Sequence, residues 1–98
     1  MLIYVVMGTC GEYSDRREWS VIAYADQKLA EQHVTLATEE AKTVAALCQE
    51  VNLETPKYFD VLKSIDVAHQ RYDGYRQSSY TDTMYCIEAV ELVDALPA

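Results

Sequence analysis

The sequence predicts an α+β fold, a three-stranded antiparallel sheet with two helices packed on one of its faces. Two observations carry this prediction: β-rich runs open and close the chain, and a long stretch of helical periodicity lies between them. With 98 residues the chain is long enough for one hydrophobic core, so we expect a single domain over residues 1–98. The expected element order is strand, strand, helix, helix, strand.

The first strand is expected over residues 2–8, an apolar run without polar alternation. Such a run is typical of a central strand that is buried on both faces. The second strand is expected over residues 18–25 and the last over residues 84–93, both rich in β-formers. Strict alternation divides the second strand between two faces: Trp19, Val21 and Ala23 on one, Ile22 and Tyr24 on the other.

The central part of the chain predicts two helices. Apolar residues recur at three- and four-residue steps from residue 30 to residue 51, and Asp26 is the expected N-cap of this helix. Thr55 and Pro56 predict the start of a second helix, because proline is tolerated at the first helical position. Its expected apolar face contains Tyr58, Phe59, Leu62 and Ile65.

The simplest packing places the first strand in the middle of the sheet, between the second and the third. The loops 9–17 and 72–83 are then neighbours at one edge, and they are rich in Tyr, Arg and Asp. These residue types are enriched at binding hot spots, so the two loops predict a binding surface. Its residues are Glu12, Tyr13, Asp15, Arg16, Arg17, Tyr72, Asp73, Tyr75, Arg76 and Tyr80. The alternative is structural: Asp15 and Asp73 form local side-chain turns, and the tyrosine rings pack over the sheet edge.

The formal net charge of -8 argues against binding to duplex nucleic acid or to an anionic membrane surface. It favours a partner protein with a basic surface, although it also serves solubility. The small size of the chain makes a homodimer compatible with the sequence. The apolar run over residues 1–8 lacks the basic region of a signal and is far too short for a membrane span, so we expect a cytoplasmic protein.

The three cysteines, Cys10, Cys48 and Cys86, are widely spaced and show no metal-ligand pattern, so neither a metal nor a cofactor is expected. Three loop aspartates, Asp15, Asp73 and Asp82, form the weaker metal alternative. Cys10 is a candidate nucleophile with His33 or His69 as its base, but such isolated sets are mostly structural. The sequence therefore favours a protein that is not an enzyme.

The two loops and the strands that follow them carry motifs. They are Gly11-Glu12-Tyr13-Ser14-Asp15, Trp19, Tyr72-Asp73, Thr81-Asp82-Thr83-Met84-Tyr85 and Val90-Glu91-Leu92. In these motifs the chain resembles a group of small, uncharacterised phage and prophage proteins. The resemblance implies a phage-related origin and a bacterial host, and it brings no activity with it.

The resulting hypothesis is a non-enzymatic, phage-derived protein that blocks or sequesters a host factor through the two loops. The host factor could be a defence component, which would make the protein similar in role to an anti-CRISPR. One alternative is a sponge for a small ligand or cyclic nucleotide, in which tyrosines stack on a base and Arg16, Arg17 and Arg76 hold phosphates. A further alternative is a small enzyme that uses Cys10.

Overall fold

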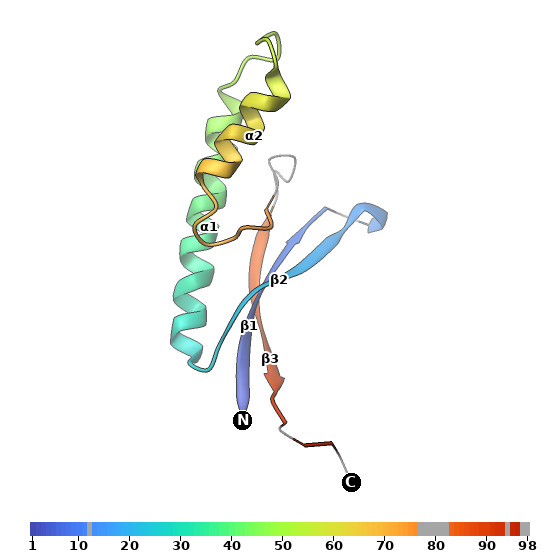
Figure 1. The fold of residues 1–98 in the computed structure, drawn as a ribbon, viewed down its shortest axis with the longest axis vertical. Coiled ribbons are helices and arrows are strands. Elements are labelled where there is room, and N and C mark those ends of the chain that lie inside the picture. The colour runs from blue at the N-terminus through green and yellow to red at the C-terminus, as the bar shows by residue number, and fades with distance from the viewer. Residues whose placement is uncertain (12, 77–82, 94, 97–98) are drawn as a thin grey trace.

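The protein has the predicted α+β fold, as a computed structural model describes it for residues 1–11, 13–76, 83–93 and 95–96. Its three strands are β1 (Leu2–Cys10), β2 (Arg17–Tyr24) and β3 (Met84–Glu91). They form one antiparallel sheet in the order β2-β1-β3, with β1 in the centre (Figure 1). The element order and the central position of the first strand are confirmed.

The β1–β2 hairpin is longer than predicted, because pairing continues to Cys10 and Arg17. The register between these strands shifts once, between Val6 and Met7. This irregularity inserts an extra residue into β2 and reverses the alternation of side chains beyond it. As a consequence Trp19 and Tyr24 lie on the same face of the sheet, whereas strict alternation had placed them on opposite faces.

Helix α1 (Gln27–Gln49) begins where the sequence predicted. The Asp26 carboxylate caps it, accepting a hydrogen bond from the Lys28 backbone N–H at 2.8 Å. A side-chain cap of this kind satisfies one of the free N–H groups of the first turn. One stripe of the helix is buried and contains Ala30, His33, Ala37 and Val44.

Helix α2 (Tyr58–Ala68) begins later than predicted. Asn52 organises a turn in front of it, because its side chain accepts from the Glu54 N–H at 2.9 Å and its carbonyl accepts from the Thr55 N–H at 2.9 Å. Lys57 then takes a left-handed conformation with φ of 56° and occupies the N-cap position. Thr55 is therefore part of a turn and not the helix cap, and the prediction for this boundary is wrong.

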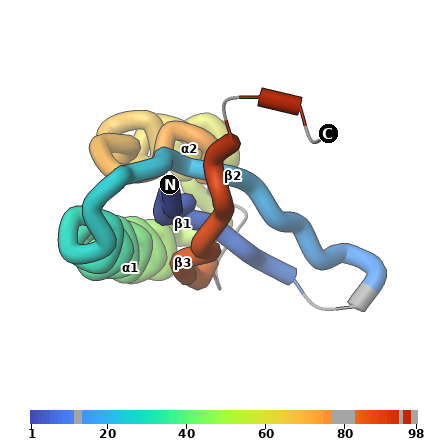
Figure 2. The backbone as a smooth tube through the Cα atoms, turned by 90° about the horizontal axis from the view of Figure 1, so that it is seen from below, coloured from blue at the N-terminus to red at the C-terminus, as the bar shows by residue number. Residues whose placement is uncertain are grey.

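The two helices lie on the same side of the sheet, α1 against the strands and α2 against α1 (Figure 2). The α2 helix and the second half of α1 extend beyond the strands (Figure 1). Phe59 is 80% exposed on α2, so it does not belong to the apolar face predicted for that helix. Neither helix of the described chain is long and apolar enough to cross a membrane.

The molecule is elongated, with extents of 61 × 29 × 18 Å and a radius of gyration of 16.2 Å. A compact domain of this length has a radius of gyration of about 13 Å. The buried apolar residues are few, Val6 and Cys10 on β1 and Ala30, Ala37 and Val44 on α1.

Candidate functional site

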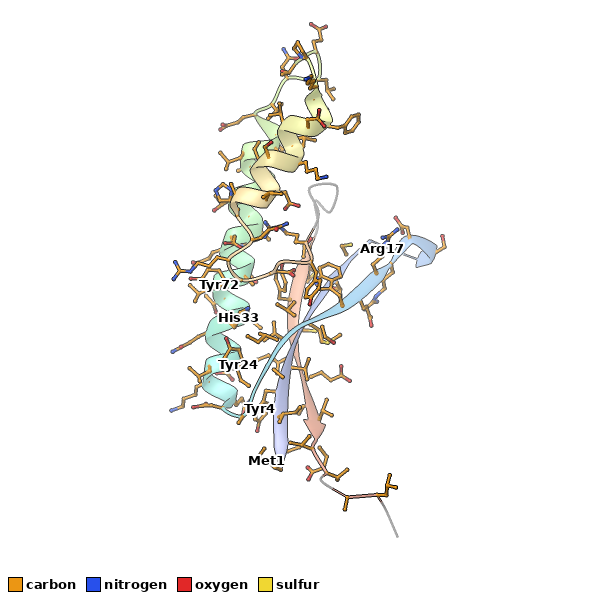
Figure 3. The ribbon with its side chains drawn as sticks, in the orientation of Figure 1. Met1, Tyr4, Arg17, Tyr24, His33 and Tyr72 are labelled. Atoms are coloured by element: carbon orange, nitrogen blue, oxygen red, sulfur yellow. The ribbon has the colours of Figure 1, made fainter. Side chains whose placement is uncertain are left out.

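The residues predicted to form one binding surface belong to two regions with different environments. The first, the hairpin tip, comprises residues 13–18 at the end of the β1–β2 hairpin. The second, the docked segment, comprises residues 69–76 between α2 and β3. Figure 3 shows Arg17 out on the hairpin, well away from His33 and Tyr72 beside α1.

Arg76 holds the docked segment against the two helices. Its side chain is 2% exposed. The guanidinium donates to Asp66 Oδ1 from Nε at 3.3 Å and from Nη2 at 3.2 Å, and Nη2 also donates to the His69 carbonyl. Nη1 lies 3.6 Å from the carboxylate of Glu40 on α1. Because a buried guanidinium requires charged partners, this arrangement fixes α1, α2 and the docked segment to one another.

Asp73 joins the docked segment to the sheet. This carboxylate is 1% exposed and accepts from Trp19 Nε1 at 3.0 Å and from the Tyr85 hydroxyl at 2.6 Å. Its other oxygen accepts from the Tyr75 backbone N–H at 2.9 Å, which is the local turn that the structural alternative predicted.

Gly8 is the position on β1 that makes this arrangement fit. It pairs with Trp19 on β2 and with Tyr85 on β3, so the three residues form one row across the sheet. A Cβ atom at Gly8 would lie 2.4 Å from Cε2 of the Trp19 indole. Only glycine therefore lets the indole lie flat on the central strand.

Two residues of α1 complete the contacts of the docked segment. The Glu40 carboxylate accepts from the Arg71 and Tyr72 backbone N–H groups, each at 3.2 Å. His33 Nε2 lies 2.6 Å from the Tyr72 carbonyl and Nδ1 lies 2.8 Å from the Tyr24 hydroxyl. A carbonyl can only accept, so Nε2 donates to it, and Nδ1 of the neutral ring accepts from the tyrosine.

The buried contacts of the docked segment have their clearest electrostatic effect on the pKa of Tyr85. Burial raises the pKa of its hydroxyl well above the ordinary value, and the hydrogen bond to the Asp73 carboxylate raises it further. Tyr85 is thus held as a neutral donor. Burial also raises the pKa of the Cys48 thiol, which makes this thiol a poorer nucleophile.

The hairpin tip presents its charges to solvent. Gly11, with φ of 80°, turns the chain out of β1, and a short 3-10 turn follows over Tyr13–Asp15. A Cβ atom at Gly11 would lie 2.5 Å from the Asp15 carbonyl oxygen, so this tight turn also requires glycine. Arg16 and Glu18 form a surface ion pair at 2.8 Å. The exposed residues of the tip are Ser14, Asp15, Arg16, Arg17 and Glu18.

The predicted binding residues therefore have different positions. Asp73 and Arg76 are buried within the docked segment, and Tyr72 is half-buried against α1. Tyr75 is 64% exposed beside them. Asp15, Arg16 and Arg17 are exposed on the hairpin tip. Glu12, Tyr80, Asp82 and the side chain of Tyr13 lie outside the described part of the structure.

The sequence interpretation missed the partners of the docked segment, which are His33, Glu40, Asp66 and Tyr85. One signal pointed to Asp66: it follows Leu62 and Ile65 at helical spacing, so it continues an apolar stripe where a carboxylate requires a partner. Arg76 was the nearby cation that could supply one. The spacing of Glu40 and His33 on α1 gave no comparable signal.

The histidines, the acidic side chains and one groove bear on the catalytic, metal and ligand alternatives. Both ring nitrogens of His33 are engaged as described, and His69 Nδ1 lies 2.8 Å from the Ile65 carbonyl. Among the described residues no group of three His, Cys, Asp or Glu side chains is placed to hold a metal ion. A shallow groove of about 320 Å³ runs between α1 and the start of β3, and Lys42 is the cation among the described residues lining it.

The geometry thus separates a buried polar network from an exposed, structured hairpin tip. Comparison with known proteins adds no family to this description: no family model matches the chain, and no curated protein or solved structure matches it.

Proposed function

We propose that the protein is a non-enzymatic, phage-derived binding protein that blocks or sequesters a bacterial host protein through its hairpin tip. The observation that carries the proposal is the contrast in exposure between the two loops. Charged side chains of residues 14–18 face solvent at the end of a rigid two-stranded hairpin, where the tip points away from the helices (Figure 1). Binding residues are often presented in this way, on a loop that a rigid scaffold positions.

Two further observations support this proposal. The tip overlaps the Gly11-to-Asp15 motif, one of those through which the sequence resembles small phage proteins. The charge of -8 over the whole chain favours a partner with a basic surface, because complementary charge accelerates encounter. A defence component of the host is one class of partner that fits this description.

The alternatives have less support. A nucleotide sponge would use Arg76 for phosphate, but this side chain is buried against Asp66 and Glu40. An enzyme built on Cys10 would use His33 or His69 as its base, and the ring contacts of both histidines are with Tyr24, Tyr72 and Ile65.

The experiment that tests the proposal inverts the charges of the tip without changing the net charge. Arg16→Glu combined with Glu18→Arg keeps an ion pair across the same positions but reverses its direction. The matched control is Asp60→Lys with Lys63→Asp on α2, where both side chains are exposed. The three immobilised proteins are incubated with bacterial lysate, and the captured proteins are identified by mass spectrometry.

We expect one host protein to be captured by the wild type and by the α2 control, and to be lost with the tip variant. Capture that is equal for all three proteins would exclude the tip as the binding site. If no protein is captured, the blocking function is wrong, and a nucleotide released on heating the wild-type protein would support the sponge instead.

A further inference from the structure

One face of the sheet has no layer upon it among the described residues. The helices lie on the side of Val6, Gly8 and Tyr85, as the contacts of Trp19, Tyr85 and Tyr24 with the docked segment and His33 establish. Figure 2 shows both helices on this side of the strands. We call the opposite side the open face.

The open face is largely apolar. On β1 it carries Ile3, Val5 and Met7, which are half-buried. On β3 it carries Val90, opposite Ile3, and Cys86, opposite Met7. Met84, at the start of β3, is 68% exposed and Val90 is 39% exposed.

This composition conflicts with a sheet that has water on one side. Antiparallel sheets of that kind alternate between apolar and polar residues along each strand. The β1 sequence does not alternate, and it predicted a strand that is buried on both faces. In the structure α1 covers one of these faces, so the sequence is built for a second layer.

The accessible surface leads to the same conclusion. The chain exposes 7152 Å². A compact monomer of 11.1 kDa exposes about 5,700 Å², so the excess is roughly 1,500 Å². A stable dimer of standard size buries about 800 Å² on each partner, which this excess can supply.

We propose that a second copy of the chain covers the open face, so that the protein is a homodimer with its two sheets packed face to face. An apolar sheet face is best matched by another sheet face about 10 Å away, and a two-fold axis brings an identical one. Among the described residues two carboxylates share this face, Glu88 opposite Val5 and Glu18 opposite Thr9, and both stand on edge strands, from which they can reach the rim. The proposal is independent of the host partner, because Arg16 and Arg17 lie at the hairpin tip and are not part of the open face.

The test places lysines on the open face. Met84→Lys with Val90→Lys changes two side chains that are exposed in the single chain, so we expect the monomer fold to be retained. The matched control, Phe59→Lys with Val67→Lys, makes the same charge change on α2, at side chains that are 80% and 60% exposed. The mass of each protein is measured by sedimentation equilibrium over a wide range of concentration, with circular dichroism as a check on the fold.

We expect twice the chain mass of 11.1 kDa for the wild type and the α2 control, and the single-chain mass for the open-face variant. A wild type that stays monomeric at every concentration overturns the proposal. So does an open-face variant that remains dimeric, or an α2 control that dissociates as well.

Cys86 provides a second readout that does not depend on a variant folding normally. Its thiol is exposed in the single chain and lies on the open face, opposite Met7. In the dimer, alkylation of Cys86 in the wild type becomes several-fold slower as the protein concentration rises, because the second copy covers it. A rate that is independent of concentration, together with a dimeric mass, would place the interface elsewhere.

Discussion

The docked segment and the hairpin tip are built from the same residue types and have opposite environments. Each contains arginine, aspartate and tyrosine within a few residues. In the docked segment Asp73 and Arg76 are almost completely buried: Asp73 accepts from Trp19, Arg76 donates to Asp66, and Arg76 Nη1 has the Glu40 carboxylate at 3.6 Å but no hydrogen bond. On the hairpin tip Arg16 and Glu18 are exposed and paired with each other. Local composition therefore does not distinguish a buried network from a binding surface.

What distinguishes the two regions is the supply of partners from elsewhere in the chain. A charge that leaves water requires an opposite charge and hydrogen bonds in return. Glu40 and Asp66 supply these to Arg76, and Trp19 and Tyr85 supply donors to Asp73. Substitutions in the two regions should therefore differ widely in their effect on stability.

Arg76→Met removes the cation from the docked segment and leaves the Asp66 and Glu40 carboxylates buried without it. We expect the free energy of unfolding to fall by about 3–5 kcal/mol, the usual effect of removing one partner of a buried ion pair. Urea unfolding followed by circular dichroism measures the change. Arg76→Lys retains the charge and should lose less. A loss below about 1 kcal/mol for Arg76→Met would mean that the network contributes little to stability.

Gly8→Ala places a Cβ atom where the Trp19 indole lies, 2.4 Å from Cε2. Overpacking of this kind costs about 1–3 kcal/mol, and thermal unfolding measures it. Gly74→Ala is the matched control, because a Cβ atom there meets nothing within 4 Å. We expect the control to be neutral or slightly stabilising. If Trp19→Leu does not relieve part of the Gly8→Ala loss, the indole is not the cause of it.

Tyr85 predicts a dependence of stability on alkaline pH. In the unfolded chain its phenol ionises near pH 10, whereas the folded state keeps the proton because its pKa is raised. The folded state then binds more protons than the unfolded state, so stability falls as the pH rises above about 10, by at most about 1.4 kcal/mol per pH unit. Urea unfolding between neutral and alkaline pH should show a shallower fall for Tyr85→Phe. Equal slopes would contradict this account of Tyr85.

Arg16→Met should have the smallest effect on stability. Its ion pair with Glu18 is exposed, and pairs of this kind contribute less than about 1 kcal/mol, decreasing with added salt. Urea unfolding at low and high ionic strength measures this contribution. A loss as large as that of Arg76→Met would remove the contrast between the two regions.

Much of the fold could be predicted because its signals are local. The β-rich runs, the helical periodicity before residue 51 and the Asp26 cap each indicate an element from adjacent residues alone. The irregular register near Val6 was not predictable in this way, because a bulge depends on the pairing of two strands. The start of α2 depended on the turn at Asn52, which competes with the Thr55–Pro56 signal.

The candidate site was predictable only in part. The order of the strands predicted the two loops near one edge, and the hydrogen bond from Trp19 to Asp73 does join the hairpin to the docked segment. The sequence pattern went no further. It did not indicate which loop would be buried. Burial of the docked segment depends on Glu40, a charged residue of α1 that is far from Arg76 in the sequence. Tyrosine and arginine occur in buried networks and on binding surfaces alike, so their presence did not decide between the two.

The position of Trp19 has an optical consequence. It is the one tryptophan of the chain, its indole lies on Gly8 and its N–H is bonded to Asp73. The near-ultraviolet emission of the protein therefore comes mainly from the single point at which the hairpin meets the docked segment. Release of that segment would expose the indole to water and move the emission to longer wavelength, so the chain carries its own label for this contact.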